Sequence, residues 1–161
     1  MKVAHKISTK NKLFLKREQS LDAFSSIEHR LEFFSKLNGK TWINDSKSTD
    51  IGATAFSIEN IEGPIIWIVG ETQKERDLDI IYDLVISKVE EIIYYGSHET
   101  KLKYRFGSKV KYSQLLDIKS AVKMALNNQS NNISVLFSPA CSSFPNHENY
   151  KARGEYFKNL I

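Results

Sequence analysis

The sequence has little cysteine and no long apolar run. Its 161 residues include a single cysteine, Cys141, which excludes an internal disulfide framework. No apolar run approaches the ~20 residues that a membrane-spanning helix needs. The start, "MKVAHKISTK", is basic and lacks the apolar stretch of a secretory signal. Because a lone thiol suits a reducing compartment, we expect a cytoplasmic protein with no membrane partner.

A strong excess of one charge is also lacking. The net charge is +4, and acidic residues are interspersed with basic ones beyond the early stretch "KISTKNKLFLKRE". Basic stretches can bind nucleic acid, but the sequence shows no recognition motif that combines basic and aromatic residues. We therefore expect a solvated surface and no nucleic-acid partner. Attraction of small anions such as nucleotides stays an alternative.

The triplet Gly39-Lys40-Thr41 looks like the end of a nucleotide-binding P-loop. That motif needs a glycine five positions before its Gly-Lys pair, and this sequence has Phe34 there. Asn38-Gly39 instead joins two apolar-rich runs, "RLEFFSKL" and "KTWIN". Because Asn and Gly tolerate positive φ, this pattern is typical of a β-hairpin. The sequence thus predicts a hairpin and not a self-contained ATPase.

After the hairpin, two kinds of apolar pattern alternate. Continuous apolar runs predict buried strands, and apolar residues three or four positions apart predict helices. The expected strands are 64–70, 91–96, 108–113 and 133–140, and the expected helices are 50–61, 78–89, 115–125 and 149–161. Residues 18–24 are compatible with a short helix, and 97–107 are expected to be a polar connection. This order predicts an α/β, Rossmann-like three-layer domain with a mostly parallel sheet and an N-terminal β-hairpin.

Two loops that follow strands carry groups suited to anions, and ligands collect at such loops in parallel sheets. In "NDSKST" (44–49), Lys47 lies near the positive end of the following helix, and Asp45 could accept hydrogen bonds from ribose. Plain helix capping by this loop is the alternative. "SPACSSF" (138–144) ends a buried strand and offers hydroxyls and amides to a carboxylate.

No metal site is expected from the sequence. The four histidines have no metal-like spacing to one another or to the cysteine: His5, His29, His98 and His147. Nothing beside Cys141 would activate its thiol, so we expect an inert buried side chain.

Three stretches in this order resemble the C-terminal domain of the Mur ligase family. They are "HRLE" (29–32), "NDSKST" (44–49), and "SPACSSF" with the following "NY", "RGE" and "F" (138–157). The first loop is similar to that of the D-glutamate-adding members. The resemblance covers about residues 20–161 and implies two parts. Residues 1–27 would be a basic lead-in left from the exit of a central domain, and 28–161 the amino-acid-binding C-terminal domain.

The resemblance implies an ATP-dependent amide ligation in peptidoglycan synthesis. The family activates the carboxylate of UDP-N-acetylmuramoyl-L-alanine as an acyl phosphate, which the amine of D-glutamate attacks. ATP and Mg would be bound mainly by a central domain that this chain does not contain. The missing N-terminal and central domains are therefore expected partners, and we expect the chain alone not to catalyse ligation.

The resemblance also implies roles for individual residues. Those expected at the hinge or the nucleotide are His29, Arg30, Asp45 and Lys47. Lys47 would also lie near the phosphates as the catalytic residue. Those expected to hold the two carboxylates of D-glutamate are Thr49 and Lys74 at one end, and Ser143, Phe144 and Tyr150 at the other.

Two loops depart from the family pattern. Glu71 replaces a second glycine in "VGETQKERD", and "PNHE" (145–148) stands where aspartate and phenylalanine are usual. The alternative function is therefore a non-enzymatic anion- or amino-acid-binding module that retains the fold without the reaction. A third is an anion-binding interaction domain that uses the basic N-terminal stretch.

Overall fold

A computed structural model describes residues 27–72, 75–98 and 101–161. The predicted lead-in up to residue 26, the helix expected at 18–24 and Lys74 lie outside these residues. Within the described ranges, no helix has the length and apolar character required to cross a bilayer.

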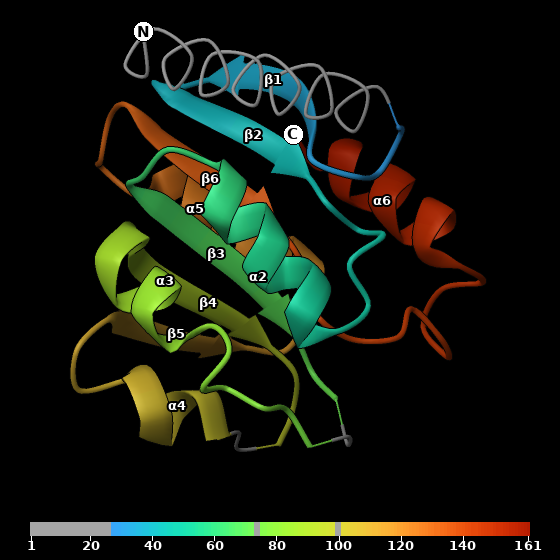
Figure 1. The fold of residues 1–161 in the computed structure, drawn as a ribbon. Coiled ribbons are helices and arrows are strands. Elements are labelled where there is room, and N and C mark those ends of the chain that lie inside the picture. Colours follow the sequence, from blue (N-terminus) through green and yellow to red (C-terminus); the bar gives the residue numbers. More distant parts are fainter. Residues whose placement is uncertain (1–26, 73–74, 99–100) are drawn as a thin grey trace, which may run out of the picture.

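Within the described residues, six strands form one sheet in the order β1-β2-β6-β3-β4-β5 (Figure 1). Their bounds are β1 Glu32–Leu37, β2 Lys40–Asn44, β3 Ile65–Gly70, β4 Val89–Tyr95, β5 Lys111–Leu115 and β6 Ile133–Phe137. Only the β1–β2 pair is antiparallel; the other four pairs are parallel. The expected α/β class with a mostly parallel sheet is therefore confirmed.

The hairpin turn lies where the sequence predicts it. Leu37 pairs with Lys40 across the turn, and the two residues between them have positive φ, 52° at Asn38 and 70° at Gly39. Such a turn matches the right-handed twist of the two strands. Gly39-Lys40-Thr41 thus runs from the turn into β2 and does not begin a helix, so the P-loop interpretation is excluded.

Helices cover both faces of the sheet and make a three-layer domain. One face carries α2 (Ile51–Asn60), α3 (Tyr82–Lys88) and α4 (Lys101–Phe106), and the other carries α5 (Ile118–Asn127) and α6 (Tyr150–Lys158). Successive strand residues point to opposite faces. Trp67 therefore packs in the α2–α3 core, while Ile66 and Ile68 pack in the α5–α6 core.

Three elements differ from the sequence prediction. The helix expected at 78–89 begins only at Tyr82, because the side chain of Asp77 accepts from the amide of Asp79 and a turn precedes the helix. The expected polar connection contains the short helix α4, which buries Leu102 and Phe106. The strand expected at 108–113 is β5 at 111–115. Short elements with few apolar residues carry too weak a periodicity to be recognised.

Candidate functional site

The loops after β2, β3 and β6 meet at one edge of the sheet, since these strands are parallel neighbours. Backbone hydrogen bonds join them. The amide of Ala140 donates to the carbonyl of Ser48 at 3.0 Å, and that of Gly70 donates to Pro139 at 2.9 Å. The two loops singled out from sequence, 44–49 and 138–144, are thus in direct contact.

Asp45 is the internal anchor of the first loop. Its carboxylate is fully buried and accepts from the backbone amide of Leu31 at 3.2 Å, from Ser57 at 2.6 Å and from Ser138 at 2.7 Å. Burial raises the pKa of Asp45 against the lowering effect of these hydrogen bonds. The carboxylate thus joins the segment before β1, α2 and the end of β6. Its contact with a nucleotide stays a prediction.

His29 is buried beside the end of β2, and its ring orientation is fixed by Asn44. The amide nitrogen of Asn44 lies 2.9 Å from His29 Nδ1 and 2.9 Å from Glu32 Oε2. Because that amide has only donors, it occupies Nδ1 as an acceptor, and the Nε2 of a neutral ring carries the proton. The sequence predicts no role for Asn44, although this residue begins the motif "NDSKST".

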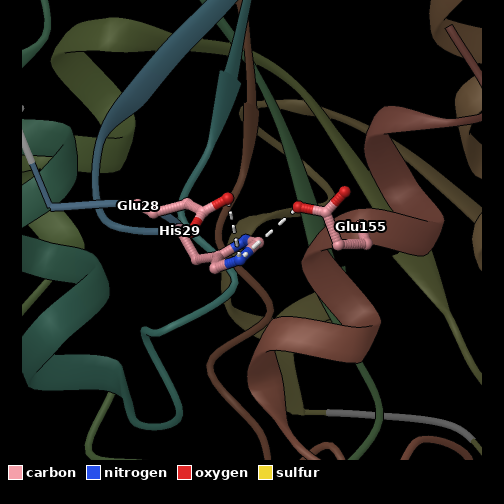
Figure 2. A group of neighbouring side chains, drawn as sticks. All are labelled: Glu28, His29 and Glu155. Atoms are coloured by element: carbon pink, nitrogen blue, oxygen red, sulfur yellow. Dashed lines mark ion pairs between the residues drawn. The ribbon is translucent and has the colours of Figure 1, made fainter.

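The Nε2 side of His29 faces two carboxylates (Figure 2), Glu155 at 3.6 Å and Glu28 at 3.8 Å. Glu28, His29 and Glu155 could each offer one atom to a metal ion, since these atoms lie within 4.8 Å of one another. Lys158 Nζ, however, already pairs with Glu155 at 2.8 Å and with Glu28 at 3.5 Å. It also contacts Glu32 at 3.0 Å. Burial favours a raised pKa for Glu32, but hydrogen bonds from Lys158, the backbone of His29 and Asn44 lower it overall. We interpret the group as an ion-pair cluster that ties residues 28–32 to α6.

Lys47 and Thr49 lie just before α2, whose N-cap is Asp50, with its side chain accepting from the amide of Ala53 at 2.9 Å. Lys47 Nζ is 5.5 Å from the ring centroid of Tyr150, within the range of a cation–π interaction. Thr49 is exposed. Lys47 and Thr49 therefore both precede the N-terminal, positive end of a ten-residue helix.

Ser143 and Phe144 line a hollow of about 960 Å³ beside the second loop. Phe144 is 74% exposed at its rim. Further polar side chains line it, among them Tyr95, Asp117, Ser142, His147 and Arg153. Burial, together with the charge of Arg153, lowers the pKa of His147. The lining of the hollow therefore contains many polar and charged side chains beside a smaller number of apolar ones.

Arg153 bridges the two loops from α6 and is only 1% exposed. Its Nε donates to Ser46 Oγ at 3.0 Å and its Nη2 to the carbonyl of Ser46 at 2.7 Å. Its Nη1 donates to the carbonyl of Cys141 at 2.9 Å. The sequence predicts no role for Arg153, although this residue lies in the motif "RGE". The feature that could have indicated a structural role is a charged residue on the buried face of the last helix.

Arg30 lies apart from the large hollow. It lines a separate hollow of about 140 Å³ with residues of the first loop and of α2: Ser48, Ala53, Phe56 and Ser57. The expected inert thiol, Cys141, is buried as predicted at 4% exposure. The structure therefore divides the predicted site into a small hollow at Arg30, a cationic edge at Lys47 and Tyr150, and the large hollow at Ser143 and Phe144. Their ligands stay predictions.

Comparison with known proteins identifies related sequences of defined function. Three are named UDP-N-acetylmuramoylalanine–D-glutamate ligase: those of Christiangramia forsetii (38% identical over 144 residues), Porphyromonas gingivalis (36% over 144) and Chlorobium limicola (34% over 143). Each alignment covers 89% of this chain, but the chain spans only 31–32% of the length of those relatives. The sequence matches no family model.

Solved structures share the fold at low sequence identity. A murein peptide ligase Mpl from Psychrobacter arcticus aligns with a TM-score of 0.58 and 9% identity, over 88% of this chain and 32% of its own. A MurF ligase from Thermotoga maritima in complex with ADP aligns with a TM-score of 0.52 and 12% identity, over 84% of this chain and 30% of its own.

Proposed function

This chain belongs to the Mur ligase family as a homologue of its C-terminal domain, and from that premise we propose that it binds D-glutamate for an ATP-dependent ligation. In that reaction D-glutamate would be joined to UDP-N-acetylmuramoyl-L-alanine, and this domain would close over a nucleotide bound mainly by a central domain. The observation that carries the proposal is the direct contact between the Lys47–Thr49 loop and the Ser143–Phe144 loop, through the amide of Ala140 and the carbonyl of Ser48.

The chemistry of the two loops fits a dicarboxylate that reacts with an acyl phosphate. A molecule with a carboxylate at each end needs donors at both ends. The hydroxyl of Thr49 belongs to one loop, and the hydroxyl and amide of Ser143 belong to the other. Lys47 precedes α2, with its Nζ 5.5 Å from the ring centroid of Tyr150, and a cation there would offset charge on a transferred phosphoryl group. Mg bound with ATP would supply the remaining charge neutralisation.

A chimeric ligase tests this proposal. In it, the chain replaces the C-terminal third of the Christiangramia forsetii ligase, to which it is 38% identical, and D-glutamate-dependent phosphate release is measured. We expect turnover that requires D-glutamate. Lys47→Ala and Thr49→Ala should each lower kcat/KM at least about tenfold, since hydrogen bonds to charged groups contribute about 1.5–3 kcal/mol.

The matched control is Lys123→Ala, which removes an exposed lysine of α5 and should leave turnover unchanged. Normal turnover in the Lys47 and Thr49 variants would refute the site assignment. A folded chimera that binds D-glutamate without releasing phosphate would favour the alternative, a non-enzymatic binding module.

A further inference from the structure

Arg76 contacts the second loop, 138–144, from the loop that follows β3. Its Nη2 donates to the carbonyl of Ala140 at 3.1 Å and to the carbonyl of Gly70, the last residue of β3, at 2.5 Å. The guanidinium therefore joins the end of β3 to the second loop. Arg76 itself lines a separate hollow of about 450 Å³ beside α4. It can thus affect the large hollow through the backbone that it holds.

Ala140 has a backbone conformation that a non-glycine residue rarely adopts. Its φ is 51°, in the left-handed region, where the Cβ of an L-residue lies too close to the backbone. Such a conformation costs free energy and persists only where surrounding contacts hold it. Ala140 is buried, its amide donates to the carbonyl of Ser48, and its carbonyl accepts from Arg76. These hydrogen bonds hold the peptide groups on both sides of the residue.

Two carboxylates near Arg76 in the sequence have other partners. Glu75 pairs with Lys101, and Asp79 pairs with Arg105 at 2.6 Å. The guanidinium of Arg76 instead donates to the two backbone carbonyls, and hydrogen bonds from a charged donor are stronger than those between neutral groups. The contact with Ala140 is therefore strong enough to oppose the cost of the left-handed conformation.

Ala140 immediately precedes the part of the second loop that lines the large hollow, residues 141–144. A change of φ at Ala140 would redirect this part of the chain. We propose that Arg76 is a positioning residue, which holds Ala140 in its left-handed conformation and thereby sets where residues 141–144 lie. That these residues bind the amino-acid substrate rests on the proposed function. That Arg76 positions them rests on its contact with Ala140.

Amide NMR of the 161-residue chain tests this role. Arg76→Gln removes the charged donor. We expect the amide signals of Ser142 and Ser143 to shift in this variant. The amide of Ala140 should exchange with solvent at least about tenfold faster relative to the interior amides of β3, since a hydrogen bond from a charged group is lost. Unchanged signals and unchanged exchange would overturn the proposal.

A second substitution distinguishes positioning from general support of the fold. Because glycine adopts positive φ without the cost that alanine has, Ala140→Gly should make the loop insensitive to Arg76. The signals of Ser142 and Ser143 in the double variant Arg76→Gln/Ala140→Gly should therefore match those of Ala140→Gly alone. A shift as large as that caused by Arg76→Gln in the wild-type chain would show that Arg76 does not act through Ala140.

The same pair of substitutions covers a failure to fold. If Arg76→Gln alone does not fold, recovery of the fold in the double variant would support the proposal, and a double variant that stays unfolded would refute it. Arg105→Gln is the matched control. It removes an exposed arginine that lines the same 450 Å³ hollow as Arg76 and pairs with Asp79, and it should leave the exchange of the Ala140 amide unchanged.

The chimeric ligase separates the role of Arg76 from the proposed function. In an active chimera, Arg76→Gln should raise the KM for D-glutamate about tenfold with a smaller change in kcat, because a displaced loop weakens substrate binding. Ala140→Gly should restore the KM, and a KM that Arg76→Gln leaves unchanged would refute the role of Arg76. An inactive chimera, with the expected NMR shifts and their rescue in the 161-residue chain, would refute the ligase proposal and leave the positioning role standing.

Discussion

Gly154 lets the last helix approach His29 and Asn44 closely. A Cβ at this position would overlap His29 Nδ1 and lie 3.0 Å from Asn44 Nδ2. These two atoms form the contact that orients His29, so a side chain here would break it or push α6 away. The close approach, and not backbone conformation, accounts for the glycine.

Substitution of this glycine should be costly. Gly154→Ala is expected to lower the free energy of unfolding by about 1–3 kcal/mol, the usual cost of overpacking a tight interior. Gly52→Ala is the matched control, because Gly52 is exposed in α2 and its Cβ would approach only Asp50 Oδ1, at 3.3 Å. The control should stabilise the fold by up to about 1 kcal/mol. Urea denaturation measures both, and equal stabilities of the two variants would contradict the overlap.

Asp45 and Arg153 show what sequence reasoning can miss at single positions. The motif placed Asp45 in a ligand-binding loop, yet its carboxylate is enclosed by Leu31, Ser57 and Ser138. These partners come from three distant parts of the chain. Burial of a loop aspartate depends on such long-range contacts, and no local pattern reveals them.

Three helices of the described chain begin with the same kind of N-cap hydrogen bond. Asp50, Asp117 and Asn149 each accept a hydrogen bond from the backbone amide three residues later, at 2.7–2.9 Å. These caps fix where α2, α5 and α6 begin. The cap of α2 in particular sets the position of Lys47 and Thr49 before the helix end.

The cap of α5 should make stability depend on pH. The hydrogen bond from the amide of Ser120 lowers the pKa of Asp117 below 3.8. The ionised cap therefore stabilises the fold above pH 3.8, and this contribution is lost as the pH falls through the lower, folded-state pKa. In Asp117→Asn the contribution should not vary with pH.

The difference is measured by urea denaturation of both proteins between pH 7 and pH 2.5. We expect the wild-type chain to lose up to about 1 kcal/mol more than Asp117→Asn over the acidic range. Parallel pH profiles for the two proteins would show that the pKa of Asp117 is the same in the folded and unfolded chain. Asp117→Ala, which removes the cap, should be less stable than wild type at pH 7.

One sheet joins two separate cores in the whole molecule. Trp67 lies in the core under α2 and α3, and Trp42 lies in the core under α5 and α6. Both are fully buried, but their indole nitrogens differ. Trp67 Nε1 donates to the carbonyl of Ser138 at 2.8 Å, whereas the buried Trp42 Nε1 has no hydrogen-bond partner in the described part of the chain.

Two single-tryptophan variants test whether the cores unfold together. Because the strands contribute to both cores, fluorescence of Trp42→Phe and of Trp67→Phe should each follow the same transition as circular dichroism. Trp67→Phe should be less stable than Trp42→Phe by about 1 kcal/mol, because only the indole of Trp67 donates a hydrogen bond that the substitution removes. Separate transitions for the two probes would show that the layers unfold independently.

The sequence by itself determined the hairpin, the alternation of strands and helices, and the two loops that carry polar groups. Each depends on neighbouring residues, such as Asn38-Gly39 at the turn or the apolar run that became β3. Only the tertiary structure decided that β6 lies between β2 and β3, that Asp45 is enclosed, and that Arg153 joins the two loops. These features arise from pairings between residues far apart in the chain, whose energies are set by which strands and helices meet in space.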